Sequence, residues 1–311
     1  MMMISTLIKS LTLFLCLALS VGFYTLVERK VLSYAQLRKG PNKAGFLGIP
    51  QPLADAMKLF TKETTKIQKS MFILYNISPV LATSIMFITW MLYNTPANQN
   101  TIIKLSIMLF IVISSLNVYT IMLSGWASNS KYALLGAIRA VAQTISYEIS
   151  MALLIMSILL ISLNFNMEKT SISQMPTLWM MFILPLIFSA WMITMLAETN
   201  RSPFDLAEGE SELVSGFNIE YGSGEFALLF IAEYGSILFV TVLTATLMLK
   251  GSFNTINLTQ MVKIMTLAFT FLWVRATFPR MRYDALMSLT WKTFLTLTIC
   301  SVTMLITHNN I

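Results

Sequence analysis

The sequence predicts an all-α membrane protein of about eight transmembrane helices, with one further amphipathic helix at the membrane interface. The first observation is composition, because 56% of the 311 residues are hydrophobic and 11% are charged, against about 25% charged in soluble domains. The second is a mean hydropathy of +0.71. The third is a series of apolar stretches long enough to cross about 30 Å of hydrocarbon. Lipid is therefore the expected solvent for most of a single polytopic domain.

The first apolar stretch begins like a signal peptide. Lys9, an apolar run and the tripeptide Ala18-Leu19-Ser20 resemble a leader and its cleavage site. The run continues to Val27 without a polar segment, which favours a retained first span. The eight predicted spans cover residues 4–27, 70–93, 102–124, 133–163, 176–197, 224–248, 260–278 and 285–306. The fourth is longer than a simple crossing needs, so we expect it to tilt or to extend beyond the bilayer.

The loop after the first span contains the predicted interfacial helix. Residues 40–52, GPNKAGFLGIPQP, are too rich in Gly and Pro for a helix. In the following stretch, PLADAMKLFTKE, the apolar residues recur at helical spacing and the charged residues fall opposite them. The apolar residues are Leu53, Ala56, Met57 and Phe60. Such a helix suits an anchor on anionic lipid such as cardiolipin or the wall of a portal that opens at membrane level, and the sequence leaves both readings open.

Basic residues are distributed unevenly over the predicted loops. The loops after spans one, three, five and seven, with the adjoining helix ends, hold 15 of the 21 Lys and Arg residues. By the positive-inside rule these loops face the cytoplasm, or the matrix of a mitochondrion, and both termini lie on the other side. The net charge of +7 follows from this bias, so nucleic acid is not an expected partner.

Ligands for redox metals are scarce. The chain has two cysteines, Cys16 and Cys300, and one histidine, His308, whereas an iron–sulfur cluster needs about four thiolates. The 23 Met residues scatter through apolar runs, as gap-filling side chains do. We expect no redox cofactor and no metal site in this chain, so that electrons for any redox reaction come from elsewhere.

Acidic residues gather in one segment. Residues 197–234 hold eight of the 14 acids and one cation, Arg201. Each ionised carboxylate deep in lipid costs about 2.5–3.5 kcal/mol, so these acids are expected to face protein or water. Burial and like-charge crowding raise the pKa of a carboxyl group towards neutrality. A chain of such groups can relay protons.

The fourth span has polar residues on two sides. Arg139 and Glu148 are nine residues apart, about 900° of helix, and therefore point in opposite directions. Gln143, Ser146 and Ser150 share the face of Arg139, which predicts a helix buried in protein on both sides. A solvated loop remains the alternative for Glu208, Glu210 and Glu212, and Ser202-Pro203-Phe204-Asp205 resembles a helix N-cap.

Four long stretches resemble the subunit 1 family of mitochondrial NADH:ubiquinone oxidoreductase, respiratory complex I, and the resemblance covers the whole chain. They read ERKVLSYAQLRKGPNKAGFLGIPQPLADAMKLFTKE (28–63), GWASNSKYALLGAIRAVAQTISYE (125–148), AETNRSPFDLAEGESELVSGFNIEY (197–221) and WVRATFPRMRYDALM (273–287). The resemblance implies a membrane-arm subunit of the mitochondrial inner membrane, next to the peripheral arm and other membrane-arm subunits. Ubiquinone would be the substrate, with NADH, FMN and the iron–sulfur clusters held by other subunits.

The resemblance also implies two sets of site residues. A ubiquinone tunnel would be lined by Arg29, Asp55, Ala56, Phe60, Phe230, Tyr234 and Arg280. The start of an acidic proton path would comprise Glu148, Glu198, Asp205, Glu208, Glu212, Glu220 and Glu233, with Arg139 and Arg201 as internal cations. Glu225 departs from the family pattern, in which Pro or Gly is frequent, and is therefore not included.

Two other classes of protein could use the same features. A cation–proton antiporter would need buried acids, but it predicts inverted repeats, and none is evident in the sequence. A structural anchor for a soluble oxidoreductase would leave the buried acids unexplained. Membrane-bound hydrogenases have related subunits that share part of the pattern, although the long loop matches favour the quinone enzyme.

Overall fold

The computed structural model describes residues 2–64, 70–92, 104–174, 178–207, 209, 214, 216–251 and 258–309. Within these ranges the chain forms helices and turns, without strands. The helices in chain order are α1 (Met2–Ala35), α2 (Gln51–Thr61), α3 (Phe72–Met91), α4 (Ser106–Ala127), α5 (Lys131–Ser162), α6 (Met167–Ser173), α7 (Met180–Ile183), α8 (Pro185–Glu198), η2 (Gly216–Asn218), α10 (Ser223–Met248), α11 (Leu258–Thr277), α12 (Tyr283–Ser288), a π-helical turn (Leu289–Phe294) and α13 (Leu295–Asn309). The predicted fold class, an all-α membrane protein, is confirmed.

Six helical segments in the described part of the chain are long and apolar enough to cross a membrane. They are α1, α3, α4, α5, α10 and the continuous segment from α12 to α13. Helix α8 is apolar but has 14 residues, about 21 Å of helix. The eight-span topology as a whole stays a prediction.

The predicted span over 176–197 is divided in the structure. Helix α7 ends at Ile183, and α8 begins at Pro185 after a non-helical Leu184 with φ −127° and ψ 65°. Proline has no backbone N–H to donate and disfavours helical dihedrals in the residue before it. The break therefore follows from Pro185, which a count of apolar residues does not register.

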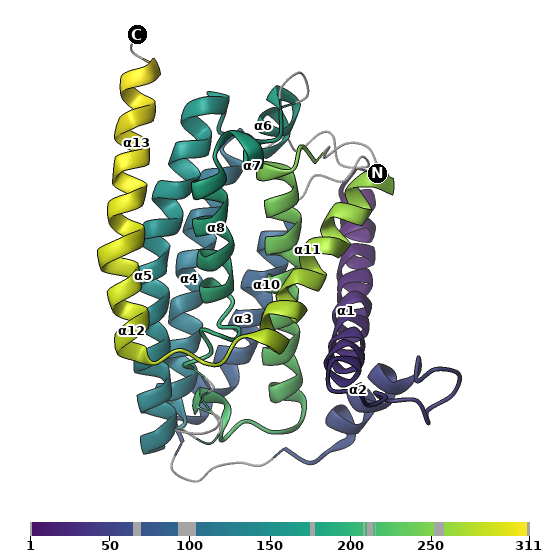
Figure 1. Cartoon of the computed structure of the whole chain (residues 1–311). Coiled ribbons are helices and arrows are strands. Elements are labelled where there is room, and N and C mark those ends of the chain that lie inside the picture. Colours follow the sequence, from purple (N-terminus) through teal and green to yellow (C-terminus); the bar gives the residue numbers. More distant parts are fainter. Residues whose placement is uncertain are drawn as a thin grey trace.

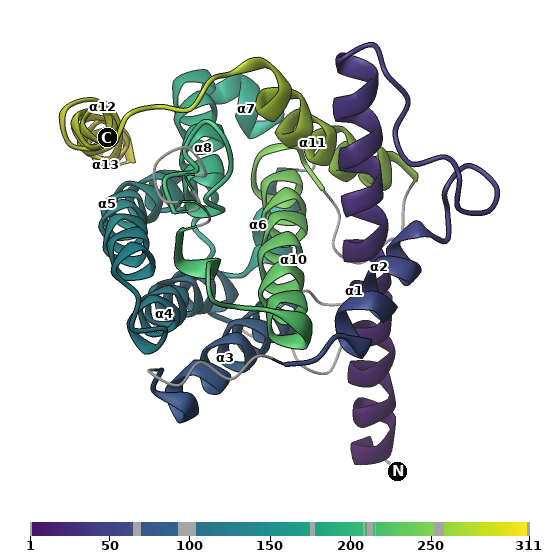
Figure 2. The same cartoon turned by 90° about the horizontal axis from the view of Figure 1, so that it is seen from below.

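Helix α10 lies in the middle of the bundle, with α1 and α13 at opposite margins (Figure 2). It packs against α1, α2, α3 and α11, while α5 packs against α4, α8 and α13. The core side of α5 carries Tyr147, Met151, Leu154 and Ile158, all nearly or fully buried at the spacing of one helical face. The bundle places α1 and α13 so that the start of one and the end of the other lie at the same end (Figure 1).

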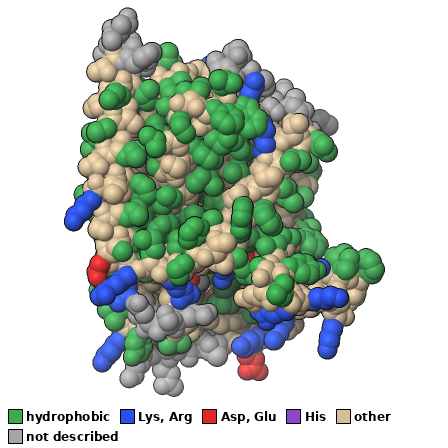
Figure 3. Space-filling view, in the orientation of Figure 1, with side chains coloured by type: hydrophobic (Ala, Val, Ile, Leu, Met, Phe, Trp, Pro, Cys, Tyr) green, Lys and Arg blue, Asp and Glu red, His purple; other side chains and the backbone are tan. Residues whose placement is uncertain are grey.

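The two ends of the bundle differ in charge. In Figure 3 hydrophobic side chains cover the middle of the wall, and Lys and Arg gather at the lower end, next to α2. Helix α2 corresponds to the amphipathic helix predicted from the first loop, and its apolar Leu53, Met57 and Phe60 are each more than half exposed. On the face shown, most Lys and Arg side chains therefore lie at the end of the bundle opposite the one at which α1 begins.

Candidate functional site

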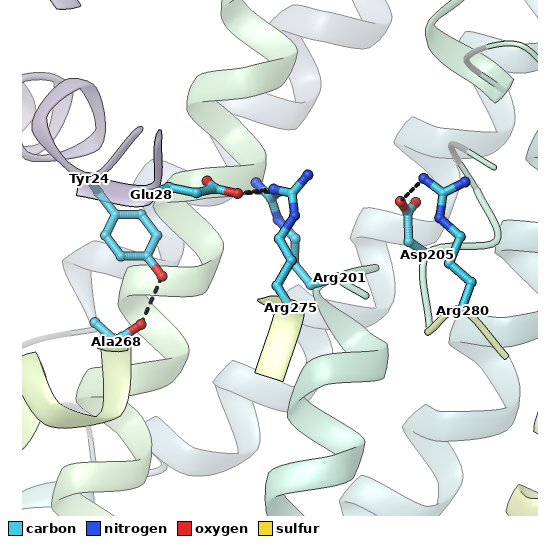
Figure 4. Close-up of polar contacts among 7 residues, drawn as sticks. All are labelled: Tyr24, Glu28, Arg201, Asp205, Ala268, Arg275 and Arg280. Carbon is cyan, nitrogen blue, oxygen red and sulfur yellow. Dashed lines mark hydrogen bonds and ion pairs between the residues drawn. The ribbon is translucent and has the colours of Figure 1, made fainter. Parts of the chain in front are cut away.

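A buried glutamate joins two arginines near the basic end of the bundle (Figure 4). Glu28 on α1 is 4% exposed and accepts a hydrogen bond from Nη1 of Arg275 on α11. Nη1 of Arg201, in the turn after α8, lies 3.6 Å from the same Glu28 oxygen. We call Glu28, Arg201 and Arg275 the arginine cluster. A charged group so far from water needs such partners, because an unpaired buried charge is very costly.

A second ion pair lies beside this cluster. Nη2 of Arg280 is 3.1 Å from Oδ2 of Asp205 (Figure 4). The backbone N–H of Met281 also donates to Pro203 O, so the 203–205 turn is bound to the segment between α11 and α12. Arg275 and Arg280 both line an open depression of about 410 Å³. Guanidinium groups are pure donors, so this depression suits a ligand with acceptor oxygens.

An aromatic row leads to the arginine cluster along α10. Phe226, Phe230 and Tyr234 follow each other at four-residue spacing, with ring centroids 4.4 and 6.0 Å apart. Tyr24 of α1 meets Tyr234 edge to face at 6.0 Å. The guanidinium carbon of Arg201 lies 4.2 Å above the Tyr234 ring, within the range of a cation–π contact. The row therefore passes from apolar rings to fixed positive charge.

The acids form a separate site, a cavity between α3, α4, α8 and α10. Its volume is about 80 Å³, enough for several water molecules at about 10–15 Å³ each. Glu198 at the end of α8 and Glu233 on α10 both line it, together with Asn117, Asn200 and Thr120. We call it the acidic cavity. Polar side chains and room for water are what a proton needs to pass between carboxylates.

Glu148 on α5 lies at the edge of this acidic region. Its charge acts on Glu198, so the two carboxylates are within electrostatic reach of each other. Its Oε1 is buried, with no hydrogen-bond partner among the described residues. On the other side of α5, Gln143 donates its amide N–H to Ala197 O and Phe204 O, at 3.1 and 2.8 Å. The two polar sides of this helix therefore face protein.

The two sites share their supporting backbone. Glu198 lines the acidic cavity and Arg201, three residues on, belongs to the arginine cluster. On α10, Glu233 lines the cavity while its neighbour Tyr234 contacts Arg201. Displacement of either segment therefore moves a residue of each site.

The predicted tunnel residues occupy two regions of the structure. Phe230, Tyr234 and Arg280 lie at the aromatic row and its polar end. Nη1 of Arg29 on α1 binds Oδ2 of Asp55 on α2 at 2.7 Å, and both side chains are partly exposed. Ala56 and Phe60 are on α2 as well, and Phe60 packs close to Gly224, at the start of α10. The structure thus joins the α2 residues to the beginning of the row.

The remaining predicted residues are spread more widely. Asp205 pairs with Arg280 rather than with the cavity acids. Glu220 lies in the turn before α10, and Arg139 is half-buried on α5. Glu208 and Glu212, with Glu210, lie outside the described residues.

Several residues of these sites were not predicted from the sequence, among them Glu28, Arg275 and Asn117. Glu28 and Arg275 stand in quoted motifs, but their contact joins positions 247 apart in the chain, and no local pattern reveals it. Asn117 could have been identified from the sequence, because it is an amide within the apolar stretch of α4. Within the residues described, no group of three or more His, Cys, Asp or Glu side chains is arranged to hold a metal ion.

A multi-pass helical bundle that encloses both an arginine cluster and an acidic cavity defines a membrane protein with a charged, functional interior. The chain belongs to the NADH dehydrogenase family, whose model matches residues 8–306. It is 48% identical over 295 residues to "NADH-ubiquinone oxidoreductase chain 1" of Aedes aegypti, covering 93% of this chain and 91% of the relative. The protein of the same name from Balaenoptera physalus is 49% identical over 303 residues, covering 94% and 93%.

Proposed function

We propose that this chain is the membrane subunit of a proton-pumping NADH:ubiquinone oxidoreductase that admits ubiquinone and begins the acidic proton path. The observation that carries the proposal is the match to relatives of that name along nearly the whole of both chains. The arrangement of an aromatic row, an arginine cluster and an acidic cavity within one bundle supports it.

In this proposal ubiquinone enters beside α2 and α10. An isoprenoid tail needs an apolar bore open to lipid, and a quinone headgroup needs hydrogen-bond donors. Phe60, Phe230 and Tyr234 supply the apolar surface, and the exposed Arg29–Asp55 pair holds α2 against α1 at the mouth. Arg280, near the other end of the row, supplies N–H donors for the quinone oxygens.

The redox step belongs to partner subunits in this proposal. Electrons reach the quinone from an iron–sulfur cluster in a neighbouring peripheral-arm subunit. NADH and FMN are bound by other subunits of the same enzyme. This chain positions the quinone and contributes no redox group. Its Lys- and Arg-rich end would face the matrix and these partners, and its flanks would face other membrane-arm subunits and anionic lipid.

Protons would move through the acidic cavity. Glu198 and Glu233 exchange protons with water in the cavity, and Glu148 continues the path towards the neighbouring membrane subunit. Reduction of the quinone draws protons and changes the charge near Arg201. Since Arg201 is three residues from Glu198 and packs on Tyr234, next to Glu233, a shift there changes the surroundings of both acids.

Two truncations test the tunnel. Phe230→Ala removes an aromatic wall and Arg280→Ala removes a donor, so each should lower NADH:ubiquinone reductase activity and inhibitor sensitivity by at least about tenfold, since small misplacements of a substrate slow reactions strongly. Electron transfer from NADH to a soluble artificial acceptor, which bypasses this subunit, should persist. Phe269→Ala and Arg282→Ala are matched controls, because both side chains are exposed. Unchanged ubiquinone reduction in both test variants would contradict the tunnel.

A further inference from the structure

One half-buried acid has no place in either site. Glu225 lies in the first turn of α10, at the basic end of the bundle. Its side chain is hydrogen-bonded to that of Tyr75 on α3. The same Tyr75 hydroxyl donates to Glu220 O at 2.6 Å. The three groups connect the start of α3, the turn before α10 and α10 itself.

The single hydrogen of a phenol makes this contact a proton switch. While Tyr75 donates to Glu220 O, its oxygen can only accept from Glu225, which requires the neutral carboxylic acid. When Glu225 ionises it becomes a pure acceptor, and the phenol hydrogen must turn to it and leave Glu220 O. Loss or gain of one proton at Glu225 therefore reverses the direction of the Tyr75 hydrogen bond.

Further hydroxyl groups lie next to this switch. The ring of Tyr221 stacks on that of Tyr75 with centroids 4.2 Å apart and an interplanar angle of 2°. Its hydroxyl lies 2.8 Å from Ser78 Oγ, and Ser78 is fully buried. Burial raises the pKa of Tyr221 to about 12, opposed by the hydrogen bond with Ser78 and reinforced by the charge of Glu225. Tyr221 therefore stays protonated at neutral pH, and its hydroxyl hydrogen can point either to Tyr75 O, 3.2 Å away, or to Ser78 Oγ.

The faces that carry these groups continue into the acidic cavity. On α3, Ala82 follows Ser78 by one turn and lines the cavity. On α10, Leu229 follows Glu225 by one turn and also lines it, and Glu233 lies one turn further. Eight residues of helix separate Glu225 from Glu233, about 12 Å. The α3–α10 contact thus runs from Glu225 to Glu233, one of the acids that line the cavity.

We propose that Glu225, acting with Tyr75, Tyr221 and Ser78, is a proton inlet that supplies the acidic cavity from the basic end of the bundle. Glu225 takes a proton from solution and becomes neutral. Glu225 then gives its proton to the hydroxyl groups and returns to its anion. At the same time the hydroxyl groups release a different proton to a cavity carboxylate, which becomes neutral. The inference rests on the proposed proton path and adds where its protons come from.

The groups around Glu225 are few. Tyr75 faces it from α3 and Tyr221 from the preceding turn, where Glu220 lies on the other side of the Tyr75 hydroxyl. Helix α2 packs on the same end of α10 through Phe60, and its charged residues are Asp55 and Lys58. In the described residues, Tyr75 is the side chain that bonds to Glu225 directly, so Tyr75→Phe tests the switch while keeping the stacked ring.

The test uses the assembled enzyme in membrane vesicles, with NADH-driven ubiquinone reduction and proton translocation measured from about pH 6 to about pH 8.5. Glu225→Gln cannot carry a proton, so turnover should fall about threefold or more near pH 8, where protons are scarce, and approach the parent rate near pH 6. Tyr75→Phe should reproduce this profile, and Glu225→Asp should restore much of the rate. Glu63→Gln, an exposed acid of the first loop, should leave the profile unchanged.

Glu233→Gln separates the inlet from the path itself. A parent-like pH profile in Glu225→Gln and Tyr75→Phe, with translocation lost in Glu233→Gln, overturns the inlet and leaves the proposed function intact. Full translocation in Glu233→Gln as well overturns both. If Glu225→Gln does not assemble, the profile of Tyr75→Phe decides, because that variant loses one oxygen and keeps the packing.

Discussion

Glu148, like Glu198, has one carboxylate oxygen enclosed without a hydrogen bond from any described residue. If it exchanges protons, Glu148→Gln, which keeps the volume but cannot titrate, should impair turnover and proton translocation more than Glu148→Asp does. If Glu148 only fills space, the order reverses, because a neutral amide is tolerated in a core. The measurement is the proton-to-electron ratio of the assembled enzyme. A full ratio in assembled Glu148→Gln would remove this residue from the path.

Glu28 makes a prediction about stability rather than transport. Glu28→Ala leaves Arg201 and Arg275 without their shared carboxylate, and loss of one partner of a buried ion pair costs about 3–5 kcal/mol. We expect less assembled enzyme on native gels and dissociation at a lower temperature. Arg29→Ala is the matched control, because its pair with Asp55 is exposed and such pairs contribute at most about 1 kcal/mol. Equal heat resistance of the two variants would contradict a stabilising role for Glu28.

Some properties of single residues could be predicted from the sequence, whereas contacts between distant residues could not. The cost of charge in lipid identified Glu148 and Glu233 as residues that need a protein or water environment, and the structure puts Glu233 at a cavity wall. It could not pair Glu28 with Arg201 and Arg275, since those contacts depend on three helices meeting. Nor could the sequence assign Asp205 and Glu198 to different sites, because the two residues are close in the chain. Only the folded structure shows that their surroundings differ.

At the scale of elements, α5 and the η2 turn approach each other more closely than side chains allow. A Cβ on Gly136 would lie 3.0 Å from the Cα of Gly216, which is backbone and cannot rotate away. Gly136→Ala should therefore displace the turn that carries Phe217 and cost about 1–3 kcal/mol. The readout is again the heat resistance of the assembled enzyme.

Gly22→Ala is the control for that substitution. The new Cβ would meet Pro52 Cβ at 3.5 Å, an ordinary contact, and Ala favours a helix over Gly by about 1 kcal/mol. We expect unchanged or higher stability at this position. A parent-like result at Gly136 would show that the turn yields more easily than its backbone contact suggests.

The elements themselves were largely predictable, for a physical reason. Long apolar runs have one stable conformation in lipid, the helix, so α3, α4, α5 and α10 follow from composition alone. The division of the fifth span at Pro185 was missed because hydropathy averages over a window and ignores the missing donor. The π-helical turn at Leu289–Phe294 has no local signal that we can identify.

At the scale of the whole molecule, the distribution of charge predicts orientation. In a chain with Cys16 and Cys300 replaced by serine, Lys39→Cys should react with a membrane-impermeant maleimide only from the matrix side of the membrane. Lys104→Cys, which follows the second span, should react only from the other side. Reaction of both from the same side would contradict the topology, because one span separates them.

Helix α10 presents aromatic rings to α1 and an acid to α3 and α4. One helix therefore separates the aromatic row from the acidic cavity and contributes residues to both. An evolutionary consequence follows. A substitution that confers resistance to an inhibitor bound along the rings also alters the helix whose other face carries Glu233 of the proposed proton path, because a rigid helix transmits even small rotations. We therefore expect resistant lineages that carry changes between Phe226 and Tyr234 to show altered energy yield, and to regain it through second changes on α3 or α4 rather than on α1.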